Sequence, residues 1–195
     1  MLKIGITGGI GSGKTTVCEI FKIINIPVYN ADFEAKKLLE NENIKHLIVS
    51  NFEENIIDKH NEIDRKKLAS IVFNDKNKLQ QLNQIIHPEV KIHFLNWIKE
   101  IDNTQKYIIF ESAIIFESGF NNIIDKTILV TSSLDEKIKR IELRDKSNKK
   151  DIVSRMKNQT NDDDLKKICD YIISNNSKNL IIPQVLKIHE KLILI

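Results

Sequence analysis

The sequence predicts an α/β protein of three layers, in which helices cover both faces of a mainly parallel five-stranded sheet. Two observations support this. Short apolar runs alternate with longer runs of helical spacing, and a glycine-rich loop joins the first apolar run to the first helix. In such folds, ligands gather at the carboxyl ends of the strands. The length suits one domain, residues 1–195, with a helical insertion at about 43–101 and a lid at about 138–160.

The apolar runs predict five strands, because they are short, rich in isoleucine and bounded by polar or turn-forming residues. Pro27 stands near the start of the second run, where a strand tolerates proline. The strands are expected at residues 2–7, 26–29, 107–111, 127–131 and 171–173.

Helical spacing of apolar residues follows the glycine-rich loop, where Val17, Phe21 and Ile24 form a stripe that can pack on a sheet. From about residue 43 to 101 the sequence shows helical stripes and no clear strand. This is more helix than one crossover between parallel strands needs, so we expect an insertion that covers the second substrate. Further along, Ser133 and Glu136 have the spacing of a capping box at the start of a helix.

The glycine-rich loop runs from Gly8 to Thr16 and reads GGIGSGKTT. Between a strand and a helix, the pattern G-x-x-x-x-G-K-[ST] predicts a phosphate-binding loop. Glycines let backbone N–H groups approach a polyphosphate, and the next helix directs its positive end at the anion. Lys14 is expected to reach the β- and γ-phosphates, and the Thr15 hydroxyl to bind Mg²⁺. The sequence therefore predicts a P-loop NTPase fold that binds a nucleoside triphosphate with Mg²⁺.

Composition excludes several other classes. Apolar residues at 41% and charged residues at 29% are ordinary for a globular protein, and a net charge of +3 does not indicate a nucleic-acid-binding surface. Cys18 and Cys169 are far apart and form no C-x-x-C pair, which favours free thiols. No apolar run approaches the roughly 18 residues that span a bilayer, and no signal peptide precedes the first strand. We expect a cytoplasmic protein with neither nucleic-acid nor membrane partners, and protein partners are left open.

Four motifs together resemble the dephospho-CoA kinase family, and with the accompanying positions the resemblance covers essentially the whole chain. The accompanying positions are Arg140, Arg144 and the run from Asp170 to Asn175. The four motifs are Thr7-Gly-Gly-Ile-Gly-Ser-Gly-Lys14, Asn30-Ala31-Asp32, His87-Pro88 and Ile114-Ile115-Phe116-Glu117.

The sequence departs from the family pattern at two positions. The family commonly has Asp where this chain has Glu111, and Pro where it has Ala113. Glu111 keeps the carboxylate but adds a methylene, so its reach toward metal or substrate differs. Ala113 removes a rigid turn, so the loop geometry there is open.

The resemblance implies an ATP-dependent phosphotransferase that moves the γ-phosphoryl of ATP, with Mg²⁺, to the ribose 3′-hydroxyl of dephospho-CoA. This is the last step of coenzyme A synthesis. The implied catalytic residues are Asp32, Lys14 and Arg140, and the implied acceptor-binding residues are Thr7, Asp32, His87 and Glu111. The implied ATP-binding residues are Gly9, Gly11, Ser12, Gly13, Lys14, Thr15, Thr16 and Arg144.

Several of these residues have structural alternatives. Asp32 is a candidate to accept the proton of the acceptor hydroxyl, but it suits equally well the N-cap of a helix beginning at Phe33. Arg140 is expected to reach the phosphates, or else to lie on a solvated face beside Glu136. For Arg144 both interpretations stay open. His87 precedes a proline and is expected at a helix break, where it contacts the acceptor or makes a structural hydrogen bond.

Two other functions remain as alternatives. One is a nucleoside or nucleotide kinase of the same fold with a different acceptor, which the long insertion and His87 disfavour. The other is a nucleotide-dependent switch, which would need a residue that positions water and a motif that reads the base. The acidic run 162–164 resembles a metal cluster, but a polar turn capping the next helix explains it better. The remaining histidines show no ligand spacing, so no zinc site is predicted.

Overall fold

The computed structural model describes residues 1–52, 56–145 and 159–195. These residues form two compact units. The first, here the sheet unit, contains Met1–Asn30 and Ile101–Ile195, and the second, the helical unit, contains Ala31–Glu100. The helical unit includes the segment predicted as an insertion and begins before it. Most of the predicted lid, residues 146–158, lies outside the described residues.

A five-stranded parallel sheet forms the centre of the sheet unit, with the strand order β2-β3-β1-β4-β5. The strands are β1 (Leu2–Thr7), β2 (Val28–Asn30), β3 (Tyr107–Glu111), β4 (Lys126–Thr131) and β5 (Tyr171–Ser174). The predicted fold class is confirmed. Some boundaries differ from the expected ones: β2 begins after Pro27 and ends at Asn30, β4 begins one residue earlier, and β5 ends one residue later.

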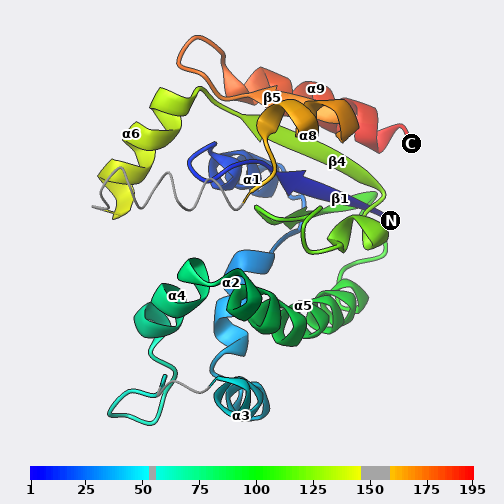
Figure 1. Ribbon diagram of the computed structural model, residues 1–195. Coiled ribbons are helices and arrows are strands. Elements are labelled where there is room, and N and C mark those ends of the chain that lie inside the picture. The colour runs from blue at the N-terminus through cyan, green and yellow to red at the C-terminus, as the bar shows by residue number, and fades with distance from the viewer. Residues whose placement is uncertain (53–55, 146–158) are drawn as a thin grey trace. The chain divides into compact units, whose positions relative to one another are not determined.

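Two helices, α1 (Lys14–Ile23) and α9 (Ile181–Ile193), pack on one face of this sheet and on each other (Figure 1). Alternate strand residues such as Ile4 and Ile6 are fully buried beneath them because successive strand side chains point to opposite faces. Burial of this apolar surface is the main stabilising term for the layer. The cluster comprises Ile4, Ile6, Val17, Cys18, Phe21, Ile26, Tyr107, Ile109, Ile128, Val130, Ile173, Val185, Ile188 and Leu192.

The other face of the sheet meets the segment that follows β3, which includes the short 3₁₀ helix η1 (Phe120–Ile123). The Phe110 and Phe120 rings lie 4.9 Å apart between centroids. A Cβ on Gly5 would lie 2.8 Å from Ile115 Cδ1, so a glycine in β1 allows this segment to pack closely. Helix α8 (Asp162–Ile168) contacts β4, and α6 (Leu134–Asp145) packs Ile138 and Ile141 against Ile10 of the glycine-rich loop.

The helical unit contains α2 (Ala31–Leu38), α3 (Glu42–Asn51), α4 (Arg65–Asn74) and α5 (Lys76–Lys99). Helix α5 contacts the other three (Figure 1). Asn41, Asp64 and Asp75 are the N-caps of α3, α4 and α5, and each side chain accepts backbone N–H groups of the first turn. The buried apolar residues of these helices are Ala31, Ile44, Ile48, Leu68, Val72, Ile86, Val90 and Phe94.

Two sequence-based expectations about this unit are wrong. Pro88 lies inside α5, which is continuous through His87, so there is no helix break at this histidine. Packing of Ile86, Val90 and Phe94 on either side of the proline outweighs the backbone hydrogen bond that proline cannot donate. Helix α2 begins at Ala31, so Asp32 lies in its first turn and is not the N-cap of a helix beginning at Phe33.

The predicted capping box of α6 forms by half. The Glu136 backbone N–H lies 3.4 Å from Ser133 Oγ, its acceptor. The Glu136 carboxylate does not return to the backbone of Ser133, because it accepts hydrogen bonds from Ser132 Oγ at 2.8 Å and the Ser177 N–H at 2.7 Å. The second half of the box is thus replaced by a tertiary contact to the segment after β5.

Candidate phosphate-binding site

The glycine-rich loop adopts a conformation that depends on its glycines. Gly11 and Gly13 have φ angles of 80° and 95°, in the left-handed region that side chains disfavour. A Cβ on Gly13 would also collide with the Asn175 side chain. Gly13 is the N-cap residue of α1 and provides no side-chain cap to the first turn. The first N–H groups of α1 therefore have no side-chain cap as an acceptor. A helix N-terminus of this kind can donate these hydrogen bonds to a phosphate.

Ser12 provides the most direct test of whether an anion fits this loop. Its carbonyl accepts a hydrogen bond from Asn175 Nδ2 at 2.8 Å, which holds the backbone in place. Its hydroxyl is buried and has no hydrogen-bond partner within the described part of the chain. A buried hydroxyl without a partner costs about 1–3 kcal/mol, so such a group points to an occupant.

Lys14, the first residue of α1, is buried, with 9% of its surface exposed. Its Nζ donates a 2.8 Å hydrogen bond to the carbonyl of Gly8. The ammonium group therefore lies against the first residue of the loop. In this position Lys14 can transfer its donors to phosphate oxygens without a large movement of the backbone.

Glu111 ends β3 and stands in register with Asn30 of β2 and Ile6 of β1. Its Oε1 accepts from Thr15 Oγ1 at 3.0 Å, and its Oε2 accepts from Asn30 Nδ2 at 2.8 Å. The side chain is buried, with 5% exposed. A hydroxyl and a carboxylate in contact provide the oxygen ligands that Mg²⁺ prefers, and this ion normally completes its shell with water and substrate phosphates.

Cys18 is a buried residue of α1, one turn beyond Thr15. Burial raises the pKa of the Cys18 thiol well above its ordinary value, and the charge of Glu111 and a hydrogen bond to it act in the same direction. The thiol therefore stays protonated at neutral pH. It serves as a donor near the carboxylate and not as a nucleophile.

The Arg140 side chain extends from α6 to the carbonyl groups of the glycine-rich loop. Nη1 donates to Ser132 Oγ at 3.1 Å and lies 3.3 Å from the carbonyl oxygens of Gly11 and Ser12. Nη2 donates to the Asn175 carbonyl at 2.8 Å. The guanidinium thus connects the loop, α6 and the end of β5.

Glu136 lies one turn before Arg140, and its Oε2 is 3.8 Å from Arg140 Nη2. Hydrogen bonds from the Ser177 N–H and Ser132 lower the pKa of Glu136 to about 2. The carboxylate is therefore ionised throughout the neutral range. Arg140 thus lies beside Glu136, but its shorter contacts are to the Asn175 carbonyl and Ser132 Oγ.

The predicted site residues fall into two groups. The sheet unit brings together Gly9, Gly11, Ser12, Gly13, Lys14, Thr15, Thr16, Glu111 and Arg140, and Thr7 is buried at the end of β1 before the loop. Arg144 is exposed on α6, one turn beyond Arg140. Asp32 and His87 belong to the helical unit, on α2 and α5, so their roles at the loop remain predictions. Burial lowers the pKa of His87.

Four residues of the site were not predicted individually: Asn30, Lys137, Gln159 and Asn175. Asn30 ends β2 and Asn175 directly follows β5, positions that could have identified them, because strand ends meet at one edge of a parallel sheet. Lys137 precedes Arg140 by three residues and shares its helical face. Gln159 gave no usable signal, because its contact with the Ile10 N–H depends on tertiary folding.

A pocket of about 460 Å³ opens beside the loop. It is lined by Gly9, Ile10, Ser132, Leu134, Lys137, Gln159, Thr160, Asn161, Asp162, Asp163 and Lys166. The acidic run 162–164 forms the first turn of α8, with Asn161 as its N-cap, which confirms the prediction of a polar turn at a helix start. Within the described residues, no group of three or more His, Cys, Asp or Glu side chains could hold a metal ion by itself.

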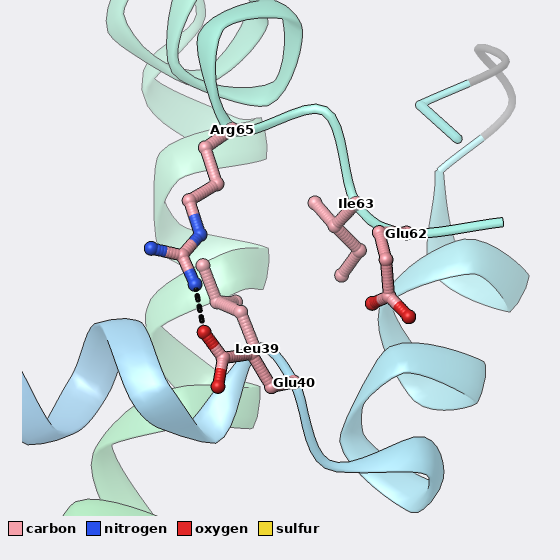
Figure 2. Close-up of a pocket in the computed structure, with 5 residues that line it drawn as sticks. All are labelled: Leu39, Glu40, Glu62, Ile63 and Arg65. Carbon is pink, nitrogen blue, oxygen red and sulfur yellow. Dashed lines mark hydrogen bonds and ion pairs between the residues drawn. The ribbon is translucent and has the colours of Figure 1, made fainter. Parts of the chain in front are cut away.

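A second pocket, of about 340 Å³, lies within the helical unit and is shown in Figure 2. Arg65 Nη2 and Glu40 Oε1 form a 2.6 Å ion pair there, both side chains being largely exposed. An exposed pair of this kind contributes little to stability. The lining residues are Leu39, Glu40, Glu62, Ile63 and Arg65, and they include none of the predicted acceptor-binding residues.

Comparison with known sequences gives consistent matches. A family model described as dephospho-CoA kinase matches residues 2–180. The chain is 42% identical over 174 residues to the dephospho-CoA kinase of Fusobacterium nucleatum, covering 89% of each chain. It is 38% identical over 196 residues to that of Porphyromonas gingivalis, covering 97% of this chain and 94% of the relative. Within the described ranges, no helix has the length and apolar character needed to cross a membrane.

Several solved structures also match this chain. TT1252 from Thermus thermophilus superposes with a TM-score of 0.85 at 26% identity, and the dephospho-CoA kinase from Campylobacter jejuni with 0.67 at 28% identity. Each match covers 97% of this chain and 96% of the other. Deoxyadenosine kinase from M. mycoides, with a TM-score of 0.53 at 17% identity over both full chains, shares the fold.

Proposed function

Because this chain belongs to the dephospho-CoA kinase family, we propose that it transfers the γ-phosphoryl group of ATP to the ribose 3′-hydroxyl of dephospho-CoA, forming CoA and ADP. The structural observation that supports this is the glycine-rich loop, which leads into a helix N-terminus without a side-chain cap, where the buried Lys14 is the first residue. Such a loop binds the polyphosphate of a nucleotide.

Phosphoryl transfer requires alignment and charge neutralisation more than covalent chemistry from the protein. The loop N–H groups and Lys14 hold the β- and γ-phosphates, and Arg140 keeps the loop carbonyls in place from the opposite side. Thr15 and Glu111 would hold Mg²⁺, which neutralises charge on the phosphates when it is bound. Arg140 and Arg144 are further candidates for contacts to ATP.

Asp32 is the proposed general base. An alcohol is a poor nucleophile at neutral pH, so a carboxylate that orients the hydroxyl and accepts its proton assists the transfer. Asp32 suits this role because it follows β2 by two residues and is exposed in the first turn of α2. Thr7, His87 and Glu111 are proposed to contact the acceptor.

The direct test is a phosphotransfer assay with purified protein, ATP, Mg²⁺ and dephospho-CoA, in which CoA and ADP are measured together. We expect ADP to form in step with CoA and to depend on dephospho-CoA. A panel of nucleosides and nucleotides tests the alternative of a different acceptor. Turnover with one of these, and none with dephospho-CoA, would overturn the proposal, as would hydrolysis indifferent to every acceptor.

Asp32→Asn tests the general base. The amide keeps the shape of the side chain but cannot accept a proton, so ATP binding should change less than about twofold while kcat falls by about a hundredfold or more. Asp135→Asn, on the first turn of α6, is a matched exposed control that should leave kcat unchanged. Unchanged turnover in Asp32→Asn would assign this residue to the helix start alone.

A further inference from the structure

Lys137, on α6, is a buried cation that the mechanism above does not use. Only 8% of the residue is exposed, and its Nζ lies 2.6 Å from Asp162 Oδ2, at the start of α8. Removing a lysine from water is costly unless it is paired, so the Asp162 carboxylate is needed to keep it there.

The ammonium group of Lys137 lies against the glycine-rich loop. A Cβ placed on Gly9 would be 3.1 Å from Lys137 Nζ, 3.6 Å from Asp162 Oδ1 and 3.7 Å from Gln159 Oε1. The same Gln159 oxygen accepts the Ile10 N–H at 2.8 Å. Three polar side-chain ends therefore meet where the pocket beside the loop opens.

The contacts at this point are those that a phosphate group would make. The Ile10 N–H donates to Gln159 Oε1, and the Lys137 ammonium group, which lies against the same loop, donates to Asp162 Oδ2. Gln159 and Asp162 supply these oxygens in the structure. Lys14 bonds to Gly8 at the same end of the loop, so two ammonium groups approach its first three residues.

We propose that Lys137 is a second phosphate-binding cation of this site, and that it exchanges Asp162 for the terminal phosphate of ATP. Asp162 is then its counter-ion in the nucleotide-free protein, and Gln159 releases the Ile10 N–H to the same phosphate. The inference rests on the proposed function only in requiring a nucleoside triphosphate in the loop, and the identity of the acceptor does not enter.

The test compares ATP and ADP binding, measured by titration calorimetry with Mg²⁺ and without dephospho-CoA. Lys137→Gln should weaken ATP binding about tenfold and ADP binding less than threefold, because only ATP carries the terminal phosphate. Lys139→Gln removes the same charge from an exposed position two residues away and should leave both affinities unchanged. Lys137→Arg keeps the cation and should retain most of the ATP affinity.

Asp162→Asn distinguishes a counter-ion that phosphate displaces from an ion pair whose role is purely structural. If Asp162 competes with phosphate, this variant should bind ATP at least as tightly as the unmodified chain, and the substitution should have no effect in the Lys137→Gln background. A purely structural pair predicts that both single variants lose thermal stability and weaken ATP and ADP alike, which would overturn the proposal. Unchanged ATP affinity in a folded Lys137→Gln variant would also overturn it.

Two outcomes keep this test separate from that of the proposed function. If Lys137→Gln does not fold, Asp162→Asn and Lys137→Arg decide the matter, since one frees the cation and the other preserves it. If the unmodified chain binds ATP but forms no CoA, the proposed acceptor is wrong while the binding comparison remains valid.

Discussion

Lys14 is positioned before its ligand arrives. The side chain is buried at the start of α1, and the Gly8 carbonyl holds its ammonium group at 2.8 Å. Part of the entropy of ordering a long side chain is therefore lost during folding and not during binding. The Gly8 carbonyl thus holds the Lys14 ammonium group at the loop before a phosphate binds.

Lys14→Ala should lower kcat by a hundredfold or more, since removing one preorganised charge contact to a phosphoryl transition state costs about 3 kcal/mol. Steady-state kinetics of CoA formation measures this. Lys22→Ala is the control, because Lys22 is an exposed lysine of the same helix paired with Glu19 at 2.7 Å. A Lys14→Ala enzyme within tenfold of the unmodified kcat would contradict the assigned role.

Glu111→Gln should raise the Mg²⁺ concentration needed for half-maximal activity by about tenfold. The amide loses the charge that binds the ion, and its NH₂ group opposes a donor, either Thr15 or Asn30. Glu111→Asp is the matched control: it keeps the carboxylate and has the residue common in the family, so its Mg²⁺ requirement should stay near that of the unmodified chain. Equal Mg²⁺ requirements in the two variants would remove Glu111 from the metal site.

At the scale of elements, the strands were the most predictable part. Residues 2–7 and 107–111 were predicted with the observed bounds, because buried parallel strands read as continuous apolar runs. Helix α5 was not predicted as one element. The proline rule indicated a break at His87, whereas tertiary packing on both sides of Pro88 keeps the helix continuous.

Pro88→Ala should therefore stabilise the chain, by as much as about 3 kcal/mol, since alanine restores a backbone donor in an exposed helical position. Urea unfolding followed by circular dichroism gives the free energy of unfolding. Ala113→Pro, which introduces the residue common in the family, is a comparison outside this helix. A lower unfolding midpoint for Pro88→Ala would show that the helix depends on the proline.

At the scale of the molecule, the sequence could identify the loop, Thr15 and Glu111, because each belongs to a linear motif or a strand end. It could not pair Asn30 with Glu111, or Asn175 with Ser12. These contacts follow from the strand order, which places β3 beside both β1 and β2 and lets β5 approach from the far side of β4. Periodicity of apolar residues carries no information about that order.

Stability should rise with pH across the titration of His87. Burial lowers its pKa in the folded state below the ordinary value of 6.5, so the unfolded chain binds more protons just below that pH. Protonation therefore favours unfolding as the pH falls through 6.5 toward the folded-state pKa. Urea unfolding at pH 5.5 and 7.5 should show a smaller difference for His87→Gln than for the unmodified chain.

His46→Gln is the control for this pH dependence, because His46 is an exposed histidine of the same unit. It should leave the difference between the two pH values as in the unmodified chain. An equal pH response in His87→Gln would assign the dependence to other groups.

The hydrogen bond from Asn175 to Ser12 joins residues 163 positions apart. Ribosomes make a chain from its N-terminus, so Ser12 emerges long before the side chain that fixes its carbonyl. A growing polypeptide therefore carries the complete GGIGSGKTT segment for most of its synthesis without the support that shapes it. The loop can therefore gain this support only after the fifth strand and Asn175 have been synthesised.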